Sequence, residues 1–215
     1  VSRRSGIMFG MLTVNACIIS IFIGMVMIDG NVRYEMLNRV MTGICYALGV
    51  LLTELFGEYV FSVIKEENKI SRWLPILLRT TCGVIGALDL VSIFNGMYFS
   101  TVNGYHVRGP LFVYNQVFVL VIMIIEMIYV LTRIRLIGRD AAALAMYGFF
   151  PLVSVILQIF VKEYVLMYPA ITLSLFIIYV VTYINQTDII KRKNTELTKA
   201  IEETEKSKKE AEKAN

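Results

Sequence analysis

An apolar run with Glu126 as its single charged residue stands at 112–132: Phe112-Val-Tyr-Asn-Gln-Val-Phe-Val-Leu-Val-Ile-Met-Ile-Ile-Glu-Met-Ile-Tyr-Val-Leu-Thr132. A helix that crosses the hydrocarbon core of a membrane needs roughly 20 mostly apolar residues. Five further runs of this kind lie at 7–28, 40–64, 73–99, 141–161 and 167–184. The sequence therefore predicts an all-α fold, a polytopic membrane bundle with six spans joined by short connections.

The composition agrees with this architecture and argues against a soluble enzyme. Of the 215 residues, 57% are hydrophobic and 18% are charged, whereas soluble domains have about 45–50% apolar and about 25% charged residues. The net charge of +4 is too small to indicate a nucleic-acid partner. The three cysteines lie in apolar runs. We therefore expect them to be small residues in the membrane core rather than partners in disulfides. We expect the lipid bilayer, and no nucleic acid, as a partner.

Lysine and arginine are divided unevenly between the two sets of connections. One set carries eight basic residues: Arg3, Arg4, Lys65, Lys69, Arg72, Arg133, Arg135 and Arg139. The opposite set carries four: Arg33, Arg39, Arg108 and Lys162. Cytoplasmic connections usually hold the excess of basic residues. We therefore expect both ends of this chain, including the C-terminus, on the cytoplasmic side of a membrane.

The segment 186–215 differs in character from the rest of the chain. Residues 191–215 hold 8 of the 21 Lys+Arg and 6 of the 17 Asp+Glu, with neither Gly nor Pro. This composition predicts a membrane domain over 1–185 and a cytoplasmic signalling helix over 186–215 that continues the sixth span. Ile190, Leu197 and Ile201 share one heptad seam, but its other positions are weak. A coiled-coil linker and a solvated single helix both remain open.

A few ionisable side chains fall inside the predicted spans, where they are costly and point to pairing or function. At a rise of about 1.5 Å per residue, Glu58 and Arg79 lie at similar depth near the cytoplasmic ends of adjacent antiparallel helices. We expect buried ion pairs between these two residues, with Glu126 as a further member and Glu54 as an alternative partner. A structural role and a switch role both remain open for this cluster.

A second polar layer is predicted toward the outside of the membrane. The residues that we expect to line a ligand-binding site there are Asp89, Asn95, Asn103, Tyr105, His106, Arg108, Asn115, Gln116 and Gln158. A few convergent polar groups in an apolar wall suit a small ligand, and His106 would make the site responsive to pH. The alternative interpretation is a set of ordinary polar and aromatic residues at the level of the lipid headgroups.

The sequence offers neither a catalytic nor a metal-binding constellation. His106 is its only histidine, which excludes a site with several histidine ligands. Neither a nucleophile–base pair nor a phosphate-binding glycine loop can be assembled. We therefore expect no catalytic residue, metal or cofactor in this chain. A small transporter or permease stays an alternative, although the sequence lacks the matched pair of broken helices typical of secondary transporters.

Several motifs resemble the N-terminal multi-helix membrane sensor regions, of seven-span type, found in bacterial signalling proteins. The motifs are Phe9-Gly10-x-Leu12 in the first run, Phe94-Asn95-Gly96-Met97-Tyr98-Phe99, Tyr105-His106-Val107-Arg108-Gly109-Pro110-Leu111-Phe112, and Leu173-Ser174-Leu175 in the sixth run. The tail from Glu205 to Asn215 is similar to the linker before the dimerisation helix of a histidine kinase. The resemblance covers nearly the whole chain.

This resemblance implies the sensor of a histidine kinase in a two-component phosphorelay, or of a related diguanylate cyclase. It implies a first span before this chain and an output domain after it, so the chain itself would be non-catalytic. ATP and magnesium would belong to the output domain of a parent kinase. The expected partners are a second copy of the chain, joined through the C-terminal helix, and an unidentified small ligand or envelope signal. The expected location is the bacterial cytoplasmic (inner) membrane.

Overall fold

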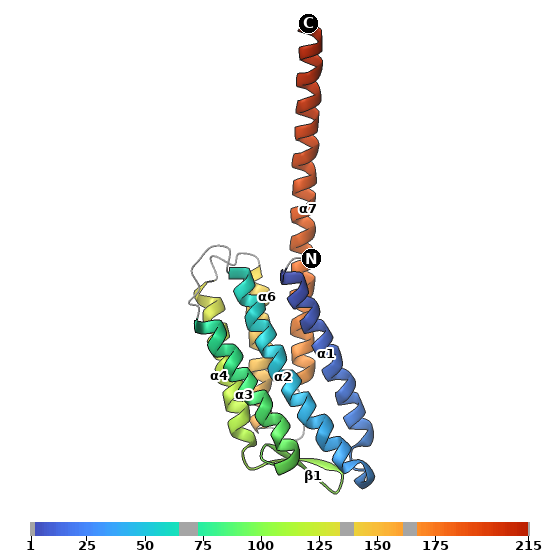
Figure 1. Cartoon of the computed structure of the whole chain (residues 1–215), viewed down its shortest axis with the longest axis vertical. Helices are drawn as coiled ribbons and strands as arrows, with labels where there is room; N and C mark the ends of the chain where they lie inside the picture. The colour runs from blue at the N-terminus through green and yellow to red at the C-terminus, as the bar shows by residue number, and fades with distance from the viewer. Residues whose placement is uncertain (1–2, 65–72, 134–139, 161–166, 215) are drawn as a thin grey trace. The chain divides into compact units, whose positions relative to one another are not determined.

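The structure is a computed structural model that describes residues 3–64, 73–133, 140–160 and 167–214. Over these residues it has six α-helices: α1 (Arg3–Ile28), α2 (Glu35–Ile64), α3 (Trp73–Asn95), α4 (Phe112–Thr132), α6 (Asp140–Phe160) and α7 (Met167–Ala214) (Figure 1). A short 3-10 helix, Val32–Tyr34, precedes α2. Two strands, β1 (Phe99–Val102) and β2 (Tyr105–Arg108), form an antiparallel hairpin. The predicted helical class is confirmed, and the hairpin is an addition to it.

Five of the described helices are long and apolar enough to cross a membrane. They are α1, α2 together with its preceding 3-10 turn, α3, α4 and α7. In α6 the described apolar stretch is shorter and covers Leu144–Leu157. The helices therefore fit a multi-pass membrane protein, and a sixth span at α6 stays a prediction.

The chain divides into two compact units, Val1–Ile178 and Tyr179–Asn215. The first unit contains the hairpin, the helices from α1 to α6 and the first turns of α7. The second unit is the remainder of α7, in which every residue from Ile189 to Lys206 is exposed. The predicted helix over 186–215 is thus observed as far as Ala214, whereas its pairing as a coiled coil stays a prediction.

The core of the first unit lies between α2, α3 and α4, which are neighbours in Figure 1. Its buried residues come from all three helices: Val50, Phe61, Leu78, Cys82, Ile85, Val119, Ile122 and Met123. On α4 the buried positions recur every three or four residues, which is the spacing of one helix face. The remaining faces of these helices carry exposed apolar side chains, as expected of helices surrounded by lipid.

The third span predicted from the sequence, 73–99, is wrong at its C-terminal end. α3 ends at Asn95, because Gly96 adopts a φ of +70° and donates its N–H to the carbonyl of Ser92. The hairpin follows, with Phe99 paired to Arg108 and Val102 to Tyr105. At its turn Asn103 and Gly104 have φ values of +54° and +82°. Two successive positive φ angles are those of the type I′ turn, which Asn-Gly favours.

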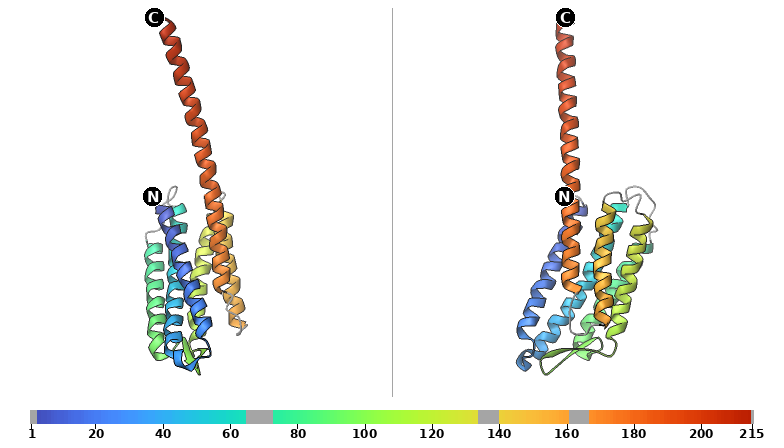
Figure 2. Two further views of the ribbon diagram at one scale, coloured as in Figure 1. Left: turned by 90° about the vertical axis from the view of Figure 1, so that its right-hand side faces the viewer. Right: turned by 180° about the vertical axis from the view of Figure 1, so that it is seen from behind.

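The hairpin is tied to the connection between α1 and α2 by hydrogen bonds. Gly30 donates its N–H to the carbonyl of Gly104 at 3.1 Å, and Asn38 Nδ2 donates to the same carbonyl at 3.2 Å. The Thr101 hydroxyl donates to the carbonyl of Glu35 at the start of α2. These bonds hold β1 and β2 across one end of the helices (Figure 2), which we call the hairpin end.

Candidate functional site

Near the hairpin end, α3 and α4 bury three polar side chains, two of which are in contact. Asn115 Nδ2 donates to Asp89 Oδ1 at 2.5 Å, and the two residues are 3% and 0% exposed. Gln116 is 4% exposed. Within the described part of the chain, neither Asp89 Oδ2 nor Gln116 Oε1 has a hydrogen-bond partner. A buried polar atom left unpaired costs about 1–3 kcal/mol, so the Asp89 cluster (Asp89, Asn115 and Gln116) is a candidate for a functional role.

An aromatic layer connects the Asp89 cluster to the hairpin. The ring of Tyr46 on α2 lies 5.3 Å from Phe99 and 6.4 Å from Phe112, measured between centroids. Tyr46 also interacts electrostatically with Asp89 and Arg108. One side chain of α2 thus packs against the hairpin and the start of α4 and lies within electrostatic range of the buried carboxyl. We call Tyr46, Phe99 and Phe112 the aromatic layer.

Two hairpin residues expected in the ligand site do pack on this layer. The His106 ring stacks on Phe99 at a centroid distance of 6.4 Å, and its Nδ1 has no hydrogen-bond partner among the described residues. The Arg108 guanidinium lies 4.7 Å from the ring centroid of Phe112, in a cation–π contact. Burial lowers the pKa of His106; Asp29 opposes this shift and Arg108 adds to it. His106 is therefore neutral at neutral pH, with one unpaired ring nitrogen.

The other predicted members of this site lie elsewhere. Asn95 is exposed, and its side chain accepts the N–H of Met97 in the turn after α3. Asn103 occupies the exposed hairpin turn. Tyr105 is 58% exposed and packs against Gly30. Two turns and the α1–α2 connection, rather than the core, set the positions of these three residues. The side chain of Gln158 lies outside the described residues.

Residues that the sequence did not single out also belong to this region. Asn38 is 1% exposed and donates to Asp29 as well as to Gly104. Asn38 Oδ1 and Arg39 Nε are buried without a partner in the described part of the chain. A polar pair at the start of an apolar run is a weak signal of burial. The Asn103–Gly104 dipeptide between apolar residues was a stronger signal, which predicts a hairpin.

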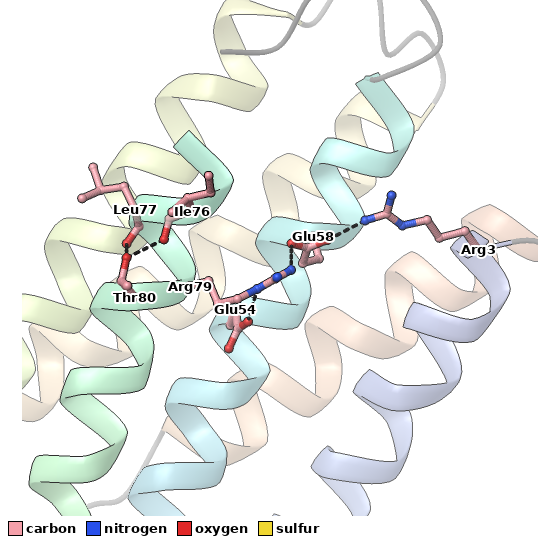
Figure 3. Close-up of polar contacts among 7 residues, drawn as sticks. All are labelled: Arg3, Glu54, Glu58, Ile76, Leu77, Arg79 and Thr80. Atoms are coloured by element: carbon pink, nitrogen blue, oxygen red, sulfur yellow. Dashed lines mark hydrogen bonds and ion pairs between the residues drawn. The ribbon is translucent and has the colours of Figure 1, made fainter. Parts of the chain in front are cut away.

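The inner ion cluster joins three helices at the end opposite to the hairpin (Figure 3). Arg79 on α3 reaches Glu58 Oε1 at 2.6 Å and Glu54 Oε1 at 3.2 Å, both on α2. Arg3 on α1 reaches Glu58 Oε2 at 2.8 Å. Both glutamates expected as partners thus contact Arg79, and Arg3 is an unforeseen member. The side chains of Glu58 and Glu54 are 14% and 20% exposed, whereas that of Arg79 is 63% exposed.

Glu126 does not join this cluster, contrary to the expectation from its depth. It is 5% exposed, and its Oε1 has no hydrogen-bond partner among the described residues. The reason is the rotation of α4, which turns Glu126 toward Gly57 of α2. A Cβ atom at Gly57 would lie only 2.6 Å from Glu126 Oε1. Depth along a helix predicted the level of this carboxyl but not the face from which it projects.

Comparison with known proteins adds nothing to this geometry: no protein-family model, curated protein or solved structure matches the chain. Within the described residues, no group of three or more His, Cys, Asp and Glu side chains could hold a metal ion. The candidate functional features on this end of the bundle are the Asp89 cluster and the aromatic layer.

Proposed function

We propose that this chain is the membrane-embedded sensor module of a bacterial signal-transduction protein of the sensor histidine kinase type. In this proposal six helices span the cytoplasmic membrane, a small ligand or envelope signal acts at the hairpin end, and α7 passes the signal to a cytoplasmic output domain. The observation that carries the proposal is the Asp89 cluster near the hairpin, in which Asp89 Oδ2 and Gln116 Oε1 have no hydrogen-bond partner among the described residues. Native proteins rarely leave such atoms unpaired without a functional reason.

The chemistry of the site favours a ligand that donates hydrogen bonds from an apolar body. Asp89 Oδ2 and Gln116 Oε1 are free acceptors within the described part of the chain. Tyr46, Phe99 and Phe112 supply apolar ring surface between the hairpin and the ends of α2 and α4. A site of this kind holds a small molecule by burying its apolar part and orienting it through one or two polar atoms.

The first turns of α7 have the contacts needed to register a change in the bundle. Asn15 Nδ2 on α1 donates to Thr172 Oγ1 at 3.2 Å, and Cys45 on α2 is hydrogen-bonded to Tyr168. Tyr168 also lies within electrostatic range of Tyr46 and Asp89. A ligand shifts a conformational equilibrium only through different affinities for two arrangements. A ligand at Asp89 would act on α7 through Tyr46 and Tyr168.

The test uses the natural protein in membrane vesicles incubated with radiolabelled ATP. We expect acid-labile, base-stable phosphate on the protein, which is the signature of phosphohistidine. Formation of cyclic di-GMP from GTP would instead identify a diguanylate cyclase. Uptake of a labelled solute without either activity would identify a transporter. Either of these two outcomes would overturn the kinase assignment.

The site itself is tested by Asp89→Asn, with Glu54→Gln as the matched control outside the site. Neutralising Asp89 changes the balance between two receptor states, so we expect a change in basal phosphorylation. A shift of 1 kcal/mol corresponds to a factor of about 5. If Asp89→Asn and wild type show the same basal phosphorylation at equal amounts of protein in the membrane, the Asp89 cluster is not the signal-sensing site.

A further inference from the structure

Glu126 belongs to neither the Asp89 cluster nor the inner ion cluster, and its surroundings are unusual for a carboxyl group. It projects from α4 into the bundle, where only 5% of the residue is exposed. Titratable groups on two other helices, Cys82 of α3 and Tyr147 of α6, lie within electrostatic range of it. Within the described residues Glu126 makes no ion pair, because Arg79 is engaged with the glutamates of α2. Among the residues that the structure describes, the carboxyl group therefore lacks a compensating cation.

Two cavities meet at this carboxyl group. The first, of about 10 Å³, is lined by Glu126 together with Thr53, Met123, Tyr147 and Pro151. The second, of about 20 Å³, is lined by Glu126 with Gly57, Leu78 and Tyr129. A cavity needs a volume of roughly 10–15 Å³, measured as the space open to the centre of a water molecule, to hold one water. Each cavity thus has room for about one water beside the carboxyl group.

Two residues on the helices around Glu126 leave space for its carboxyl group and for water. At Gly57 any larger residue would meet both Glu126 Oε1 and the Leu78 side chain, so the missing side chain provides the space that the carboxyl occupies. Pro151 lies inside α6 and has no N–H, so the carbonyl of Tyr147, one turn earlier, lacks its helical donor. Pro151 and Tyr147 both line the first cavity. A water there can accept from a protonated carboxyl and donate to this carbonyl.

We propose that Glu126 is a proton-binding site in the interior of the bundle, and that water in the two cavities exchanges its proton. The physical reason is that an unpaired carboxylate in a low-dielectric interior costs several kcal/mol. Binding a proton removes the charge and supplies an O–H donor for the water. The site is separate from the Asp89 cluster and does not depend on the function proposed above. At neutral pH the carboxyl group is protonated.

The charged groups described on the surrounding helices do not supply a positive charge to Glu126 in place of the proton. On α2, Glu54 and Glu58 are paired with arginines, and on α3 Arg79 is the shared partner of both. Tyr129 on α4, Cys82 and Tyr147 are neutral groups that cannot supply a positive charge. α7 contributes only Ile171 to the lining of the first cavity. A proton is therefore the simplest positive charge that fits the space.

The experiment is infrared spectroscopy of the chain in lipid nanodiscs at neutral pH, because a protonated carboxyl and a carboxylate absorb at separate frequencies. We expect a protonated-carboxyl band that Glu126→Gln removes and that Glu58→Gln, a matched change at a paired glutamate, leaves in place. Asp89→Asn identifies any contribution from the other buried acid. A band that survives in Glu126→Gln, or wild-type protein without any such band, would overturn the proposal.

Two further measurements test whether the bound species is a proton and whether it lies next to Gly57. Gly57→Ala intrudes on the carboxyl, so we expect it to shift the frequency of the band, whereas Gly83→Ala, which meets open space, leaves it unchanged. Loss of the band on adding sodium at constant pH would identify a metal-cation site instead and would overturn the assignment to a proton. The wild-type spectrum needs no variant, so the proposal can fail even if Gly57→Ala does not fold.

Discussion

Glu58 is the residue on which the inner ion cluster depends, because it pairs with arginines from two other helices. Its Oε1 contacts Arg79 and its Oε2 contacts Arg3, whereas Glu54 has a single, longer contact. We expect Glu58→Gln to lower the free energy of unfolding by about 1–2 kcal/mol, and Glu54→Gln by about 0.5 kcal/mol. Reversible unfolding in mixed detergent micelles measures both losses.

A double-mutant cycle separates the ion pair from the general effect of losing charge. Arg79→Gln combined with Glu58→Gln should show a coupling energy of about 1 kcal/mol. The control combines Arg79→Gln with Glu35→Gln, at the other end of α2, and should show none. Equal losses from Glu54→Gln and Glu58→Gln, with no coupling to Arg79, would contradict the central place of Glu58 in the cluster.

At the scale of elements, hydropathy predicted the helices well but could not predict where α3 ends. The run 112–132 coincides with α4, because apolar content and helix length agree there. The run 73–99 continues past the end of α3, since Gly96 and Asn95 stop the helix by backbone conformation and side-chain capping. Neither effect changes the hydropathy of the apolar residues that follow.

The candidate site shows the same division between what spacing predicts and what packing decides. Depth along antiparallel helices placed Glu58 level with Arg79, and the two are in contact. It also placed Glu126 at that level, yet Glu126 faces Gly57. The rotation of a helix about its own axis depends on side-chain packing across the bundle, as with Gly57 and Leu78. The spacing of apolar residues along a single helix does not determine this rotation.

Gly104 carries the conformation on which the hairpin depends. Its φ is +82°, and a Cβ atom there would lie 2.7 Å from the backbone nitrogen of Asn31. We expect Gly104→Ala to destabilise the protein by about 1–3 kcal/mol, from strain and overlap together. Gly83→Ala is the matched control, because it lies in α3 facing open space, where alanine is the better helix former. Unfolding measurements in micelles compare the two.

The opposite result has a clear meaning. If Gly104→Ala were as stable as Gly83→Ala, the turn would have to relax away from the α1–α2 connection at no cost. In that case the contact of Gly30 with Gly104 would not fix the hairpin, and the position of His106 over Phe99 would lose its structural basis.

At the scale of the whole molecule, the number of spans determines on which side of the membrane the chain ends. With α6 as a span there are six crossings, and both ends lie on the same side. With only the five helices that meet the length and hydropathy requirement in the described residues, the two ends would lie on opposite sides. With the N-terminal end in the cytoplasm and only five crossings, the eight basic residues of 191–215 would lie outside the cytoplasm. The usual excess of basic residues on the cytoplasmic side therefore favours six crossings with both ends in the cytoplasm.

Reporter fusions test this topology directly. We expect alkaline phosphatase, which is active only outside the cytoplasm, to be inactive when fused after Asn215 and active when inserted at Asn103 in the hairpin turn. Green fluorescent protein at the same two positions should give the reverse pattern. Phosphatase activity at Asn215 would mean that α6 does not cross the membrane, and α7 would then lead away from the cytoplasm. The sensor proposal requires α7 to end in the cytoplasm, so this result would exclude it.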